Sequence, residues 1–138
     1  MPMLTLISRV LVVIAVAGLV LGVGGSQEDP AEAVSFAATI QPFFNQQCVA
    51  CHLTGAAGGG VNLEPGVAHE ALVEVESTAT MLHVTPGDPE LSYLVHKLRG
   101  THLEVGGNGM LMPLGGQPIS EEMLDLVERW IAEGALDN

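Results

Sequence analysis

The feature that most constrains this chain is the position of its only two cysteines, which stand together in Cys48-Val49-Ala50-Cys51-His52. Two thiols about one helical turn apart can each add across a vinyl group of a haem, which forms two thioether bonds. The adjoining imidazole then lies under the iron and can take one axial position. The segment therefore predicts one haem c, covalently attached through Cys48 and Cys51, with His52 as an iron ligand.

Three other uses of the cysteine pair are less consistent with its surroundings. A thioredoxin-type dithiol needs a strand–helix setting, whereas the end of a helix and a glycine-rich loop flank this pair. A zinc site needs further ligands, such as His69 or His83, and the spacing matches no zinc finger. A structural disulfide between residues this close would be strained and would close almost no loop.

An iron that only transfers electrons needs a second axial ligand, and Met112 is the leading candidate. It lies 60 residues after His52 in a glycine-rich segment, where the backbone can pass close to a flat macrocycle. Pro113 restricts the backbone directly after this methionine. Met110 is the next candidate and His102 the third, ahead of Met81, Met123, His69, His83 and His96, so the sequence leaves the distal ligand open.

The N-terminal segment has the pattern of a secretory signal. Arg9 is its only charged residue, and an unbroken run of apolar and small residues follows from Val10 to Val23. The alternative is an uncleaved helix over Leu4–Val23, about 30 Å long, which could cross a bilayer and tether the protein. Both interpretations predict that the rest of the chain is periplasmic or otherwise exported, either free or anchored to the inner membrane.

The length of 138 residues allows one small folded domain. We expect residues 1–25 to be the signal peptide or anchor, residues 26–34 a linker, and residues 35–138 a monohaem domain. One Trp, one Tyr and three Phe are few aromatic side chains for a core. A porphyrin would supply the missing apolar volume.

The charge balance limits the partners that this chain can have. Sixteen acidic residues against four Lys and Arg give a formal net charge of −12, which excludes binding along a nucleic-acid backbone. An acidic surface instead favours redox protein partners that dock through a basic surface. The sequence does not determine the oligomeric state.

The last segment shows the clearest helix. Ser120 is a suitable N-cap residue, and apolar residues from Met123 to Ile131 recur with helical spacing. Gly134 is expected to end this helix. Trp130 is expected to pack between it and the first helix.

Three further helical segments are expected. The first runs from Phe36 to Gln47 and should be kinked or restarted at Pro42. The second is a short turn over Glu70–Glu74, and the third covers Asp88–Leu98 with an apolar face that includes Leu91. The prediction is an all-α, cytochrome c-like fold of three to four helices around one covalently bound haem, preceded by the N-terminal apolar helix.

Several polar or charged residues, some of them on or next to the third helix, are candidates for contacts with a haem. Tyr93 should pack beside the macrocycle with its hydroxyl bonded to a polar group. Either Lys97 or Arg99 is expected to pair with a haem propionate or to lie on the solvated surface. His83, like His69 and His96, is expected to be an ordinary polar residue.

Several short segments match the pattern of a known family over the stretch from Val34 to Ala135. They are Ile40-Gln41-Pro42, Cys48 to His52, Pro86-Gly87-Asp88-Pro89-Glu90 with Ser92-Tyr93-Leu94, Met112-Pro113, and Trp130-Ile131 with Gly134-Ala135. This stretch resembles the small c-type cytochromes of the planctomycete-type domain, which are related to class I cytochrome c. The resemblance implies that Cys48 and Cys51 hold the haem, that His52 is the proximal ligand and that Met112 is the distal one.

One departure from that family concerns the proximal histidine. No Gly-Pro pair closely follows His52, so the carbonyl that should orient its ring is not identifiable from the sequence.

The sequence thus predicts an exported electron carrier, not an enzyme, that passes single electrons between redox partners. If no residue filled the sixth position, the iron would be five-coordinate, as in a haem enzyme or gas sensor. If the N-terminal helix stayed in place, the protein would be a fixed haem subunit of a membrane respiratory or photosynthetic complex.

Overall fold

A computed structural model describes residues 32–56, 58–115 and 117–138. The predicted signal or anchor, including Leu4–Val23, lies outside these residues. Among the helices that the structure does describe, none has the length and apolar character needed to span a bilayer.

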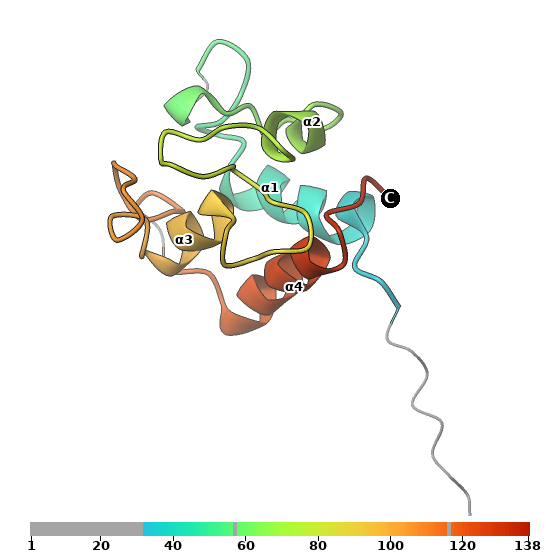
Figure 1. The fold of residues 1–138 in the computed structure, drawn as a ribbon. Helices are drawn as coiled ribbons and strands as arrows, with labels where there is room; N and C mark the ends of the chain where they lie inside the picture. Colours follow the sequence, from blue (N-terminus) through green and yellow to red (C-terminus); the bar gives the residue numbers. More distant parts are fainter. Residues whose placement is uncertain (1–31, 57, 116) are drawn as a thin grey trace, which may run out of the picture. The chain divides into compact units, whose positions relative to one another are not determined.

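The described part of the chain is all-α, as the sequence predicted, and contains four α-helices and no β-strand (Figure 1). Backbone bridges between single residues, such as Val73 with Val84, replace strands in the long connection between the second and third helices. The helical elements are η1 (Phe36–Ile40, a π-helical turn), α1 (Gln41–Gln47), η2 (Gly58–Gly60, a 3₁₀ turn), α2 (Ala68–Leu72), α3 (Tyr93–Arg99) and α4 (Glu121–Ala132).

The first helical segment restarts beside Pro42, as predicted. Proline has no N–H to donate to the preceding turn, and Pro42 occupies the first turn of α1. Just before it, the Gln41 N–H donates to the Phe36 carbonyl, five residues earlier, which gives η1 its wider π-helical turn. The Ser35 side chain caps η1 by accepting a hydrogen bond from the Ala38 N–H at 3.1 Å.

Helix α4 has the ends and the buried face that the sequence predicted. The Ser120 hydroxyl accepts a hydrogen bond from the Met123 N–H at 3.2 Å, which satisfies one free donor of the first turn. The helix ends at Ala132, and Gly134 follows with a φ of 105°, a conformation that favours glycine.

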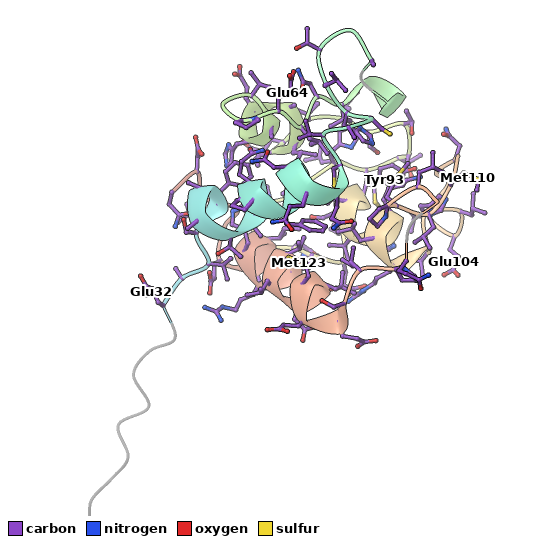
Figure 2. All side chains as sticks on the ribbon, turned by 180° about the vertical axis from the view of Figure 1, so that it is seen from behind. Glu32, Glu64, Tyr93, Glu104, Met110 and Met123 are labelled. Atoms are coloured by element: carbon purple, nitrogen blue, oxygen red, sulfur yellow. The ribbon has the colours of Figure 1, made fainter. Side chains whose placement is uncertain are left out.

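The core joins α4 to the first helical segment through Trp130. Its side chain is only 1% exposed, and its ring centroid lies 5.3 Å from that of Phe36 in η1. The indole N–H donates to the Leu136 carbonyl at 2.9 Å, so the polar atom of this side chain is satisfied. Helix α4 packs against η1 and α3 (Figure 1), and Figure 2 shows Met123 on α4. The expected packing of Trp130 is confirmed.

The last residues of the chain close against the first described ones (Figure 1). The Asn138 side chain accepts a hydrogen bond from the Phe36 N–H at 2.8 Å, and the Asn138 carbonyl accepts one from the Ser35 hydroxyl at 2.7 Å. The Glu133 carboxylate accepts a bond from the Val34 N–H at 2.7 Å. The bonds to the Val34 and Phe36 N–H groups satisfy backbone donors that no helical turn can satisfy at the start of η1.

Helix α3 begins at Tyr93, not at Asp88, so the predicted start was wrong. The Asp88 side chain accepts a hydrogen bond from the Leu91 N–H at 3.1 Å, and the Ser92 hydroxyl donates to the Asp88 carbonyl at 2.8 Å. Short polar side chains compete with a helix for backbone groups in this way. Leu91 therefore lies outside the helix and is 55% exposed, so its predicted place on the apolar face is also wrong.

Helix α2 is shifted toward the N-terminus by two residues relative to the predicted Glu70–Glu74. The backbone is already extended at Val73 and takes a left-handed φ of 60° at Glu74, and neither conformation continues a right-handed helix.

Candidate functional site

The cysteine segment begins where α1 ends. The Cys48 N–H donates to the Phe44 carbonyl at 2.9 Å, and the His52 N–H donates to the Cys48 carbonyl at 3.0 Å. The chain therefore keeps turning through the motif, so that both thiols and the imidazole are presented within a short stretch. Both cysteines are free thiols in the structure.

The environment of Cys48 argues against the dithiol and zinc interpretations. Burial raises the pKa of the Cys48 thiol to about 11, whereas redox-active and metal-binding cysteines need an accessible thiolate. Within residues 32–138, apart from the two undescribed positions, no group of three His, Cys, Asp or Glu side chains is arranged to hold a metal ion. His69 is engaged elsewhere, since its Nε2 lies 2.7 Å from the Ala135 carbonyl.

The ring of His52 is oriented by a backbone carbonyl that the sequence did not reveal. Its Nδ1 lies 3.1 Å from the Val61 carbonyl oxygen. With the proton on Nδ1, this contact is a hydrogen bond donated by the ring, and Nε2 keeps a free lone pair to bind a metal. A carbonyl belongs to every residue, so no side-chain pattern could have marked Val61.

Gly58 brings the glycine-rich loop against this histidine. The Gly58 N–H donates to the Cys51 carbonyl at 3.0 Å. A Cβ at position 58 would lie 3.3 Å from His52 Cε1 and 3.2 Å from the Cys51 carbonyl. A larger residue would therefore crowd the imidazole.

The two cysteines and His52 line a cavity of about 310 Å³, at the lower end of the range for small-molecule sites. Helices α1 and α3, the glycine loop (residues 58–60) and the methionine segment (residues 108–112) contribute to its walls. The lining residues are Phe44, Gln47, Cys48, Cys51, His52, Gly58, Gly59, Val61, Leu63, Leu72, Thr78, His83, Tyr93, Leu94, Lys97, Leu98, Asn108, Gly109, Met110, Met112, Pro113 and Leu114.

The three candidates for the distal ligand differ in their surroundings. Met112 lines the cavity, is half-buried and packs against the hydrophobic core. Met110 also lines the cavity but is 63% exposed, and Figure 2 shows it on the outer loop beside α3. His102 is only 3% exposed and does not line the cavity, and its Nε2 lies 3.1 Å from the Gly109 carbonyl.

Tyr93 lines the cavity, and its hydroxyl is bonded to the backbone of Asn108. The hydroxyl oxygen accepts a hydrogen bond from the Asn108 N–H at 3.3 Å and lies 3.5 Å from the Asn108 carbonyl. The partner of this hydroxyl within the described chain is thus the segment that leads to the methionines.

The two basic residues of α3 have different surroundings. Arg99 does not line the cavity and forms ion pairs with Glu90 at 2.7 Å and Glu128 at 2.8 Å. Lys97 lines the cavity, and its ammonium donates to the carbonyls of Asn108, at 3.2 Å, and Met110. Burial lowers the pKa of the Lys97 side chain.

His83 is the second imidazole of the cavity, although from the sequence it was expected to be an ordinary polar residue. Its ring centroid lies 6.1 Å from that of Tyr93. Burial, and then the charge of His52, lower the pKa of His83. His96, by contrast, is bonded through Nδ1 to the Thr101 hydroxyl at 2.8 Å and serves the loop that follows α3.

Comparison with known proteins shows a shared fold. No protein-family model matches the chain, and no curated protein matches it in sequence. Among solved structures, part of the hydrazine synthase of Kuenenia stuttgartiensis is similar, with a TM-score of 0.53 and 21% sequence identity. The similarity covers 74% of this chain but only 16% of that one, so the likeness concerns a single domain-sized part of the larger protein.

Proposed function

We propose that this protein is an exported monohaem c-type cytochrome that carries single electrons between redox partners. The observation that carries the proposal is that one cavity is lined by Cys48, Cys51, His52 and Met112 together. Two thiols, an imidazole and a thioether are the groups that attach a c-type haem and fill both axial positions of its iron. The fold shared with part of hydrazine synthase supports a cytochrome c-like domain.

The chemistry of the cavity walls fits a porphyrin. Apolar side chains such as Phe44, Leu72 and Leu98 enclose the space, and Gly58 leaves room beside the imidazole. Cys48 and Cys51 are both free and line the same cavity, so both sulfurs are available for thioether bonds. The few aromatic residues of the chain are consistent with a core completed by a cofactor.

The chain would hold both axial ligands in place. The Val61 carbonyl orients His52, and the Met112 N–H is bonded to the Lys97 carbonyl at 3.0 Å. When bound, haem supplies one-electron chemistry at iron, with a potential that a methionine ligand raises. If His52 and Met112 both bound the iron, no coordination site would remain for a substrate, which favours a carrier and not an enzyme.

The surface charge supports docking to a basic partner. The described part of the chain has three Lys and Arg residues. Arg99 and Arg129 are paired with carboxylates, and Lys97 bonds to backbone carbonyls. The remaining acidic side chains would steer a positively charged protein toward this one. The rate of electron transfer to such a partner should fall as the salt concentration rises. A rate that does not depend on ionic strength would contradict electrostatic steering.

Export rests on the apolar N-terminal segment, because c-type haem is generally attached after translocation. Mass spectrometry of the mature protein tests both points at once. A chain beginning after about residue 25 supports a free periplasmic carrier, whereas a retained Leu4–Val23 segment supports a tethered one. A mass without an added haem would contradict the proposal as a whole.

Absorption spectra of the purified protein in both oxidation states test the ligand set. We expect a sulfur-to-iron charge-transfer band in the oxidised wild type, which Met112→Ala abolishes and the matched control Met110→Ala retains. Reduced wild type should resist carbon monoxide, and reduced Met112→Ala should bind it. A band that persists in Met112→Ala would move the assignment to Met110.

His83 provides a second candidate for the distal ligand, because its ring lines the same cavity. In that case the wild type would resist carbon monoxide but lack the charge-transfer band, and His83→Ala would then become reactive toward the gas.

A further inference from the structure

We infer that Lys97 is the positioning residue that holds the methionine segment against α3, so that Met112 faces the cavity. The inference rests on the proposed function, in which Met112 is the distal ligand. It concerns a residue that would not itself touch the iron.

Three contacts join Lys97 to this segment. Its Nζ donates to the Asn108 carbonyl at 3.2 Å and to the Met110 carbonyl, while its own carbonyl accepts from the Met112 N–H at 3.0 Å. The ammonium group fixes the carbonyls of residues 108 and 110, while the backbone carbonyl of Lys97 holds the Met112 N–H. The side chain therefore adds two bonds just before Met112 to one that the backbone of α3 supplies. No other described residue bonds to all three positions.

Besides Lys97, Tyr93 bonds to Asn108 and His102 lies 3.1 Å from the Gly109 carbonyl, but neither contact reaches Met110 or Met112. Residues 108–112 belong to no helix or strand, and Asn108, Gly109 and Met110 are exposed. Backbone groups in such a loop otherwise bond to water, which gives no fixed path. Hydrogen bonds from an ammonium group are stronger than those between neutral groups.

Lys97 is placed so that its hydrogen bonds hold one wall of the cavity. Lys97 and Met112 both line it, and Lys97 lies on α3, whose residues Val95 and Leu98 are buried in the core. The lysine therefore anchors a loop of irregular structure to a rigid element. A thioether bound to iron needs such support, because a misplacement of about 1 Å at a site can greatly weaken its function.

The test compares two variants of the holoprotein that each remove one positive charge from α3. Lys97→Met keeps the aliphatic chain but loses the donors. Arg99→Met is the control, because Arg99 bonds to Glu90 and Glu128 and not to the loop. We expect reduced Lys97→Met to bind carbon monoxide at least about tenfold faster than wild type, equal to about 1.4 kcal/mol, with a weakened charge-transfer band. Arg99→Met should behave as wild type.

Two further variants test the inference if Lys97→Met does not acquire its haem. Lys97→Arg retains a charged donor and should keep the band, whereas the neutral Lys97→Gln should lose part of it and react faster with carbon monoxide. Equal spectra and equal rates for wild type and these Lys97 variants would overturn the inference.

The same measurements separate this inference from the proposed function. If the wild-type band is lost in Met112→Ala but kept in Lys97→Met, only the role of Lys97 fails. If the wild type has no such band, the proposed ligation of the iron by His52 and Met112 is wrong, whatever the Lys97 variants show.

Discussion

Replacement of Gly107 by alanine should disrupt the contact between α3 and the loop that leads to the methionines. A Cβ at this position would lie 2.4 Å from the Tyr93 hydroxyl, 2.5 Å from its ring carbon Cε2 and 2.6 Å from the His102 carbonyl. Gly107 does not adopt the left-handed backbone, so the effect of the substitution is steric and not conformational.

The size of the effect follows from how little these neighbours can move. Ordinary contacts begin at 3.4 Å, so the loop and Tyr93 would have to separate by about 1 Å, a shift that overpacked sites make only with strain. Tyr93 and His102 are both buried, and one of the contacts is with backbone. We therefore expect a loss of about 1–3 kcal/mol in the free energy of unfolding, with the hydrogen bonds between Tyr93 and Asn108 broken or lengthened.

Urea denaturation of the holoprotein measures the loss, and NMR of labelled tyrosine locates it, since Tyr93 is the only tyrosine of the chain. Gly106→Ala is the control, because Gly106 has a φ of 80° but no atom within 4 Å of an added Cβ. It should cost stability through backbone strain without moving the Tyr93 ring signals. If Gly107→Ala left both stability and the ring signals as in wild type, the described packing of the loop would be wrong.

Three further predictions concern α4 and the contacts at its two ends. Ser120→Ala should lower the free energy of unfolding by about 1 kcal/mol because α4 loses its N-cap; urea denaturation measures this, and Ser120→Asp should retain the stability. Trp130→Ala should cost about 3–5 kcal/mol in the same assay through the cavity that it leaves, and a loss below about 1 kcal/mol would contradict its central place. Hydrogen bonds from Arg129 and Val34 lower the pKa of Glu133 below its usual 4.5. The stability that Glu133 contributes is therefore present in full above pH 4.5 and is lost as pH falls through the lowered value. Acid titration of Glu133→Gln should show a shallower loss, and an unchanged acid transition would count against these bonds.

Much of the fold was accessible from the sequence because its signals are local. Ser120, the apolar stripe and Gly134 lie within one continuous segment, so the helical period and the two ends of α4 could be predicted together. Pro42 likewise marks a break, since a missing N–H acts on its own turn. Helix α3 was harder, because its start depends on where the side chains of Asp88 and Ser92 find backbone partners.

In the candidate site, too, some features follow from local sequence and others depend on folding. The motif from Cys48 to His52 is a chemical unit of adjacent residues, and its spacing alone indicates the attachment chemistry. The choice between Met110 and Met112 is different, because both have the same side chain and only Pro113 after Met112 favours one of them in the sequence. Their burial separates them more clearly, and burial depends on how the loop packs against α3.

By itself, the amino-acid sequence determined the attachment motif, the amphipathic last helix and the acidic charge of the chain, since each is a property of residue types and their spacing. The tertiary structure alone decided that the Val61 carbonyl meets His52, that His83 turns toward the cavity and that Lys97 reaches the methionine segment. Two of these contacts use backbone carbonyls, which every residue carries, and all three join segments that only folding brings together. These contacts therefore cannot be predicted from the pattern of side chains along the sequence.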